Sequence, residues 1–309
     1  MKKIPSWVDP SDAPLIEQNV HDYIVSVYRR VTGPFNSVNI VPISPGAEVD
    51  RGWDAAVMEA QPLFFQYKLP DYTSRPAKSQ SDAYRQRRLF KYDDSDGCFH
   101  FSLRKMAKKA PKSQHQLMFE MESSGCRVYY VAPTFIDPAR LRVGGYPSYD
   151  DRPWIDSHHP FFSRGHLAYA SVPLFDGLIC IPPTVSVPGA PEDHKFFFNT
   201  RYEVSLHSEP IEVHSRQLRI VLDDHISDLM TGEAITSESV DEFVSRFVSL
   251  MASNNDQDDS RYLISRYIES KMSVENNWRD NKLMIKMRAL ARVVKALYGI
   301  DMLIGAVRR

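Results

Sequence analysis

The feature that most constrains the fold is a change of hydrophobic period between residues 15 and 133. Residues 15–31 carry apolar side chains at helical spacing, and Pro14 before them suits the first turn of a helix. After residue 37 the helical spacing gives way to short apolar and β-branched runs typical of strands. These expected strands are 38–43, 52–57 and 62–69, with a turn at 58–61 between the last two.

The next segment predicts a helix and a buried strand. Residues 112–123 have an amphipathic pattern, and Gly125 stands where a left-handed helix cap is expected. Residues 127–133 are almost continuously apolar, as in a strand covered on both faces. A strand, a crossover helix and a second strand place a helix on a mixed sheet, so we predict an α/β fold for the first part of the chain.

The remaining sequence divides into two parts. Residues 137–215 are rich in proline, histidine and aromatic residues and predict short strands at 167–172, 177–181 and 202–206, so we treat them as an irregular β-rich extension of unknown role. Beyond residue 215 the period is helical, and the spacing of Leu283, Met287, Leu290, Val294 and Leu297 predicts a packing seam, either within the chain or between two copies. The predicted divisions are 1–136, 137–215 and 216–309.

Three polar residues stand out in the predicted meander. Gln66 and Lys68 lie two positions apart in an apolar strand, so their side chains point to one face while Phe65 and Tyr67 point to the other. Asp54 lies on the preceding strand of the same hairpin. Polar groups on buried strands are costly without partners, which favours a functional site, although an ordinary strand with capped polar ends remains the alternative.

This arrangement resembles the PD-(D/E)XK nuclease core, and the Asp50-x-Gly52-x-Asp54 and Gln66-x-Lys68 motifs resemble its Mrr-type branch. The resemblance covers roughly residues 12–135 and implies a restriction-endonuclease-like mixed sheet flanked by helices, followed by a helical C-terminal region. It implies that Asp54 and Gln66 bind Mg²⁺, or Mn²⁺ in its place, and that Lys68 positions or activates the attacking water. Glu17 on the first helix fits the auxiliary acid of the family.

Gln66 departs from the commoner acidic residue of that motif. A neutral amide is a weaker ligand than a carboxylate for a hard cation, so metal binding would depend more on Asp54. The expected function is a metal-dependent nuclease acting on DNA, with restriction or anti-phage defence as the setting that the resemblance implies. A nuclease-fold module that binds nucleic acid, including RNA, or a protein partner without cutting is the alternative.

A basic block supports an anionic partner. Between Arg75 and Lys112 the chain has eleven Lys and Arg against four Asp, a local net charge of +7 in a chain of net charge −1. Clustered cations bind nucleic acid by releasing counterions from its phosphates, whereas the alternative is a solvated surface loop. The predicted nucleic-acid contacts are Tyr84, Arg85, Arg87, Arg88, Lys105, Lys108 and Lys109.

Several function classes lack support. The sequence contains no Gly-x-x-x-x-Gly-Lys phosphate loop and no Gly-x-Ser-x-Gly elbow, and Cys98, Cys126 and Cys180 are too scattered for a paired-cysteine zinc site. We also expect no membrane span, because no long apolar run occurs, and we expect a cytoplasmic location. The C-terminal helices are the expected surface for a homo-oligomer or a partner protein.

Overall fold

A computed structural model describes the larger part of the chain. Statements about absent contacts below refer to this part alone. The described residues are 15–31, 38–43, 59–73, 98–108, 110–137, 141, 177–206, 211–231, 235–252, 262, 264–270 and 282–307.

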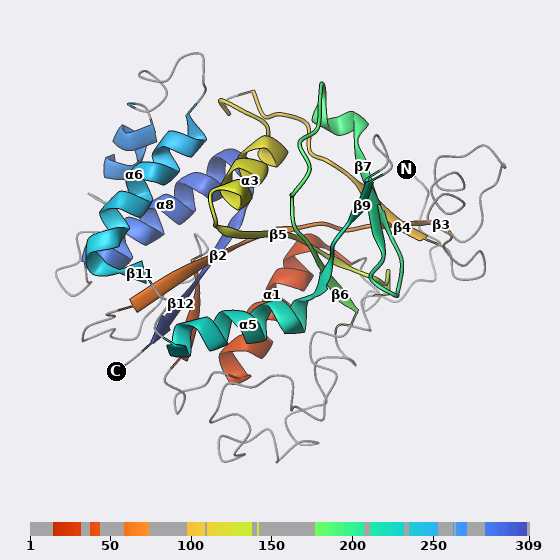
Figure 1. Ribbon diagram of the computed structural model, residues 1–309, viewed down its shortest axis with the longest axis horizontal. Coiled ribbons are helices and arrows are strands. Elements are labelled where there is room, and N and C mark those ends of the chain that lie inside the picture. Colours follow the sequence, from red (N-terminus) through yellow and green to blue (C-terminus); the bar gives the residue numbers. More distant parts are fainter. Residues whose placement is uncertain are drawn as a thin grey trace, which may run out of the picture.

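The chain forms a mixed α/β structure around a seven-stranded sheet (Figure 1). Its strands follow the order β1-β12-β2-β5-β6-β10, and β11 also pairs with β2. The last strand of the chain, β12, lies between β1 and β2 and is antiparallel to both. The strands are β1 (Val38–Ile43), β2 (Glu59–Tyr67), β5 (Arg127–Pro133), β6 (Leu178–Ile181), β10 (Arg216–Gln217), β11 (Ile235–Thr236) and β12 (Asp301–Val307).

The predicted crossover is confirmed. Strands β2 and β5 are parallel neighbours, and α3 (Gln114–Ser123) precedes β5 and packs on it. Ser113 caps α3 by accepting a hydrogen bond from the backbone N–H of Gln116 at 3.1 Å. Gly125 has a φ of +85°, so it adopts the left-handed conformation expected after the helix.

Helices cover both faces of the large sheet. Alternate residues of β2 enter different cores, because neighbouring side chains of a strand point to opposite faces. Phe64 packs with buried residues of α3, α6 and α8, whereas Leu63 and Phe65 pack with those of α1 and α5. Figure 1 shows α3, α6 and α8 grouped apart from α1 and α5. The helices are α1 (Glu17–Val31), α5 (Leu218–Thr231), α6 (Ser237–Met251) and α8 (Lys282–Tyr298).

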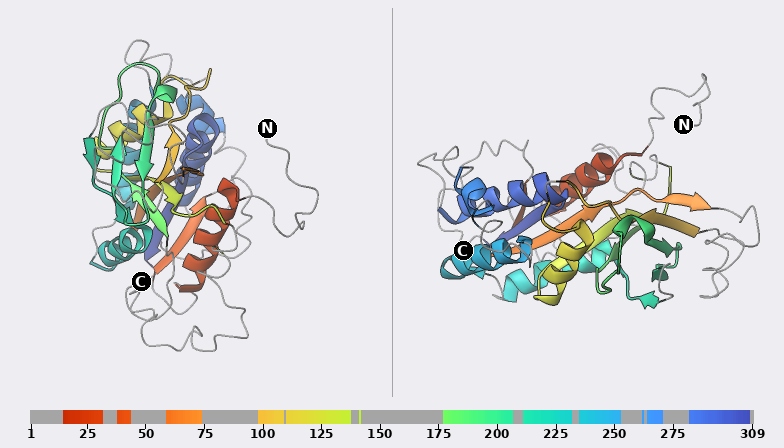
Figure 2. Two further views of the ribbon diagram at one scale, coloured as in Figure 1. Left: turned by 90° about the vertical axis from the view of Figure 1, so that its right-hand side faces the viewer. Right: turned by 90° about the horizontal axis from the view of Figure 1, so that it is seen from above.

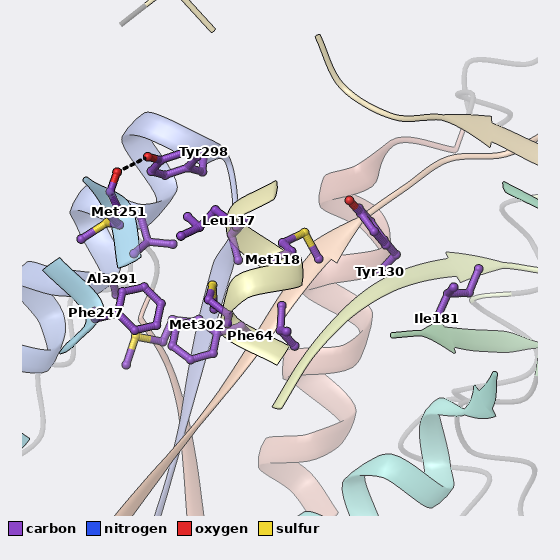
Figure 3. Close-up of a cluster of buried hydrophobic side chains, with 14 of the residues drawn as sticks. Phe64, Leu117, Met118, Tyr130, Ile181, Phe247, Met251, Ala291, Tyr298 and Met302 are labelled. Carbon is purple, nitrogen blue, oxygen red and sulfur yellow. Dashed lines mark hydrogen bonds between the residues drawn. The ribbon is translucent and has the colours of Figure 1, made fainter. Parts of the chain in front are cut away.

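The core beneath α3 joins the end of the chain to the middle of the sheet (Figure 3). Phe64 stacks on Phe247 of α6 with ring centroids 5.0 Å apart. Tyr298, the last residue of α8, donates a hydrogen bond from its hydroxyl to the backbone oxygen of Met251 at 3.0 Å. This packing fixes the C-terminal end of α8 against α6 and the sheet.

A second, five-stranded sheet has the order β3-β4-β7-β8-β9. It lies toward the end of the molecule away from α6 and α8 (Figures 1 and 2). The strands predicted around residues 177–181 and 202–206 are present, but they divide between the two sheets: β6 joins the large one and β8 the small one. The strands of the small sheet are β3 (Asp71–Thr73), β4 (Cys98–Ser102), β7 (Lys195–Phe198), β8 (Val204–Leu206) and β9 (Ile211–Val213).

Two expectations from the sequence need correction. Residues 59–61 belong to β2 and not to a turn, because Ala60 pairs with Ile235 of β11 and with Ala306 of β12. The C-terminal part is helical in α5, α6 and α8, but it also contains β12, a central strand of the large sheet. Both differences arise from strand pairing between distant parts of the chain.

The seam predicted on the last helix packs within the chain. Met287, Leu290 and Val294 of α8 are buried in the core that also contains α3 and α6. The described helices include none with the length and apolar character needed to cross a bilayer.

Candidate functional site

Two buried polar side chains mark the end of β2. Gln66 and Lys68 are only 4% and 7% exposed, on the same side of the strand as Phe64. Phe65 and Tyr67 enter the core formed with α1 and α5. The prediction that Gln66 and Lys68 share one face is therefore confirmed, and both side chains meet α3.

Gln114 connects these two residues. Its Oε1 accepts a hydrogen bond of 3.4 Å from Nζ of Lys68, and its Nε2 donates to Oε1 of Gln66 at 2.5 Å. The same Nε2 also donates to the backbone oxygen of Tyr298. The capping of α3 by Ser113 places Gln114 in the first turn of the helix, directly over the end of β2. A single buried amide thus ties α3, β2 and α8 together.

Lys68 is a buried cation that forms no ion pair with a carboxylate among the described residues. Its Nζ lies 5.7 Å from the ring centroid of Tyr130 and 5.9 Å from that of Phe101, and its only described hydrogen bond goes to the Gln114 amide. The pKa of Lys68 is lowered to about 8, mainly by burial; the charge of Glu17 opposes this shift and that of Arg104 adds to it. Such an incompletely neutralised charge is typical of functional sites.

Glu17, in the first turn of α1, acts electrostatically on Lys68. Although its side chain is exposed, desolvation by the surrounding protein raises its pKa. The positive charges of Lys68, Lys295 and Arg104 act in the opposite direction. Glu17 is thus the carboxylate that balances part of the charge of Lys68 across the end of the sheet.

An ion pair between α8 and β12 lies near the same end of the sheet. Nζ of Lys295 lies 2.5 Å from the carboxylate of Asp301, the first residue of β12, which is 4% exposed. Asp301 pairs with Phe65 in the sheet, so its carboxylate lies near the end of β2 on the face of Phe65 and Tyr67, opposite the face of Gln66 and Lys68. Because the Asp301 carboxylate is already paired with Lys295, it is less available than Glu17 to bind an added cation.

The structure brings together only some of the predicted site residues. Gln66 and Lys68 meet at Gln114, and Glu17 acts on Lys68 through its charge, whereas Asp54 lies outside the described residues. Lys105 is exposed and forms an ion pair of 3.4 Å with Glu192, and Lys108 is also exposed. The predicted contacts Tyr84, Arg85, Arg87, Arg88 and Lys109 lie outside the described residues.

Sequence reasoning missed Gln114 and Arg104 as members of the site. The only signal for Gln114 was its position after Ser113, which predicts the first turn of a helix and says nothing about the strand beneath. Arg104 was counted only as one charge of the basic block. Nothing in the sequence indicates that Gly299 lies next to Arg104 in space. Arg104 and Gln114 are ten positions apart, whereas Gly299 comes from a distant segment.

The described residues alone do not fit a magnesium site. They contain no group of three His, Cys, Asp or Glu side chains placed to hold a metal ion. Oε1 of Gln66 already accepts the hydrogen bond from Gln114, and Asp301 is paired with Lys295. Glu17 is the remaining carboxylate at the site, so a hard cation would need an additional oxygen ligand such as Asp54.

Comparison with known proteins adds no relative. No family model matches the chain, and neither the curated proteins nor the solved structures yield a match.

Proposed function

We propose that the chain is a metal-dependent nuclease that hydrolyses phosphodiester bonds of DNA, with Lys68 as the cation that meets the reacting phosphate. The observation that carries the proposal is the placement of Lys68: its ammonium group is buried at the end of β2 and lacks a carboxylate partner among the described residues. An added phosphate would supply the missing negative charge, and a positioned cation stabilises charge that develops on a phosphoryl group.

The surrounding elements support this proposal. The order of α1, a strand bearing Gln66 and Lys68, α3 and the parallel strand β5 is the order expected for a PD-(D/E)XK core. Glu17 acts on Lys68 from α1, where the resemblance places an auxiliary acid. Magnesium or manganese belongs to the proposal through Asp54 together with Glu17.

A nucleic-acid-binding module that does not cut is the second candidate. The hydrogen bond from Gln114 to Oε1 of Gln66 favours it, because that oxygen is the family position expected to complete a metal site. The carboxylates of the described part also form no metal-binding group. This candidate shares the cationic site with the first and differs in lacking the hydrolytic step.

Metal-dependent cleavage separates the two candidates. Plasmid, linear and single-stranded DNA, and RNA as a further substrate, would be incubated with the protein and Mg²⁺ or Mn²⁺, with EDTA as the control. We expect cleavage with metal, none with EDTA, and at least a hundredfold loss of rate in Asp54→Ala, since general acid–base and electrostatic groups contribute about that much or more. Intact substrate in all conditions, with binding retained, would instead support the non-cutting module.

A further inference from the structure

Arg104 has a fixed backbone position beside the candidate site. It follows β4, and the preceding residue, Leu103, is buried and donates its backbone N–H to the carbonyl of His194 at 3.0 Å. The side chain of Arg104 itself is exposed. The anchored backbone therefore presents a solvent-accessible guanidinium at the end of the sheet.

Gly299 leaves the space in which this guanidinium lies. Gly299 ends α8 with a φ of +71°, and its N–H donates to the carbonyl of Lys295 at 2.8 Å. A Cβ at this position would lie 2.5 Å from Nη1 of Arg104, 3.6 Å from Nε2 of Gln114 and 3.7 Å from Oε1 of Gln66. The guanidinium is thus adjacent to the amide pair that holds Lys68.

The charges around this point are not balanced. Lys68, Arg104 and Lys295 are three cations, and Glu17 and Asp301 are two carboxylates, which leaves a net charge of +1. The carboxylate of Glu17 is influenced by all four of the other groups. Within the described part of the chain Arg104 forms neither an ion pair nor a hydrogen bond. One phosphodiester, with a single negative charge, would neutralise the cluster.

The chemistry of the two cations suits such an anion. A guanidinium offers a planar fork of N–H donors that matches two phosphate oxygens, whereas an ammonium group acts as a point charge. Arg104 would donate hydrogen bonds to the phosphate from the exposed side, and the ammonium group of Lys68 would interact with it from the buried side. Close approach also depends on Gly299, since any side chain there would displace Arg104.

A purely structural role is the competing explanation. Gly299 marks the C-terminal end of α8, where a positive charge interacts favourably with the partial negative charge of the last carbonyls. In that case removing Arg104 would lower stability and leave ligand binding unchanged.

We propose that Arg104 is a substrate-binding residue that, together with Lys68, holds one phosphate of a nucleic-acid backbone beside Gly299. This inference rests on the proposed function and deepens it, because it assigns the phosphate position of the same site.

The test measures binding of a short fluorescein-labelled DNA duplex in EDTA, so that no cleavage interferes. We expect Arg104→Ala to raise the Kd about tenfold and to reduce the slope of log K against log salt by about one, the signature of one lost phosphate contact. Arg104→Lys should recover part of the affinity. Arg201→Ala is the matched control, because Arg201 is an exposed arginine paired with Glu203 at 3.4 Å, and its Kd should stay within twofold of wild type.

Thermal unfolding of the same variants completes the experiment. A lower Tm in Arg104→Ala with an unchanged Kd would overturn the inference in favour of the helix-end role, and so would a wild type that binds no DNA. Cleavage lost in Lys68→Ala with normal binding by Arg104→Ala would leave the nuclease proposal standing without this phosphate contact. Weakened binding by Arg104→Ala in a protein that never cuts would support the contact and reject the nuclease.

Discussion

Lys68→Met is expected to stabilise the protein by about 2 kcal/mol while it removes the proposed function. Burial lowers the pKa of Lys68 from 10.5 to about 8. At 1.36 kcal/mol for each pKa unit, keeping this buried amine charged costs about 3 kcal/mol. Loss of the hydrogen bond to Gln114 offsets about 1 kcal/mol of the gain. Methionine has nearly the same length and carries no charge, so the packing around it is retained.

The pH dependence of stability isolates this effect. The folded state holds the Lys68 proton less tightly than the unfolded state, so the cost is fully present below pH 8 and disappears as the pH rises toward 10.5. The difference in the free energy of unfolding between Lys68→Met and wild type should therefore shrink as the pH rises from 8 to 10.5. Chemical denaturation of both proteins at pH 7 and pH 10 measures it. Lys195→Met, at a half-buried lysine of β7, is the control that should leave stability nearly unchanged. A Lys68→Met protein less stable than wild type at pH 7 would contradict this account of Lys68.

Acid is expected to destabilise the fold by about 4 kcal/mol between pH 7 and pH 5, because two buried histidines must stay neutral. Burial lowers the pKa of His115 to about 4 and that of His225 to about 3. Below about pH 6.5 the unfolded chain binds a proton at each of the two histidines and the folded chain does not. Each histidine therefore lowers the free energy of unfolding by about 2 kcal/mol at pH 5. This stability is present above pH 6.5 and is lost as the pH falls toward the two folded-state pKa values.

The two histidines differ in their surroundings. The ring of His115 lies 2.9 Å from the hydroxyl of Tyr130 through Nδ1 and 2.8 Å from the carbonyl of Val185 through Nε2. Because a carbonyl only accepts, the neutral ring carries its proton on Nε2. His225 is fully buried, and neither ring nitrogen has a hydrogen-bond partner among the described residues.

His225→Leu therefore tests the acid effect most cleanly. It should remove about half of the loss between pH 7 and pH 5, as followed by urea unfolding at each pH, since it removes one of the two titrating rings. His214→Leu, at an exposed histidine, is the control and should keep the full acid sensitivity. Equal acid sensitivity in wild type and His225→Leu would show that His225 does not titrate as described.

Local sequence pattern was sufficient for the parts of the site that lie on one element. The period-two spacing of Gln66 and Lys68 fixes their common face once β2 is a strand, and the structure confirms it. The amphipathic spacing predicts the helix at α3, and Gly125 follows it as expected. These features depend on neighbouring residues and backbone preference alone.

Contacts between distant segments could not be derived in this way. Gln114 meets Gln66 across 48 positions and Tyr298 across 184. Strand β12 joins the centre of the sheet because both β1 and β2 pair with it, which no local pattern at 301–307 reveals. The approach of Arg104 to Gly299 likewise depends on where α8 ends against the sheet.

The measurement that tests the central claim most directly is the rate of plasmid cleavage by wild type, Lys68→Met and Lys195→Met at equal concentration with Mg²⁺. The proposed role of Lys68 predicts cleavage by wild type and Lys195→Met and a loss of at least a hundredfold in Lys68→Met, although that variant is folded and more stable. Undiminished cleavage by a folded Lys68→Met protein would contradict the claim that this buried ammonium group serves the reaction.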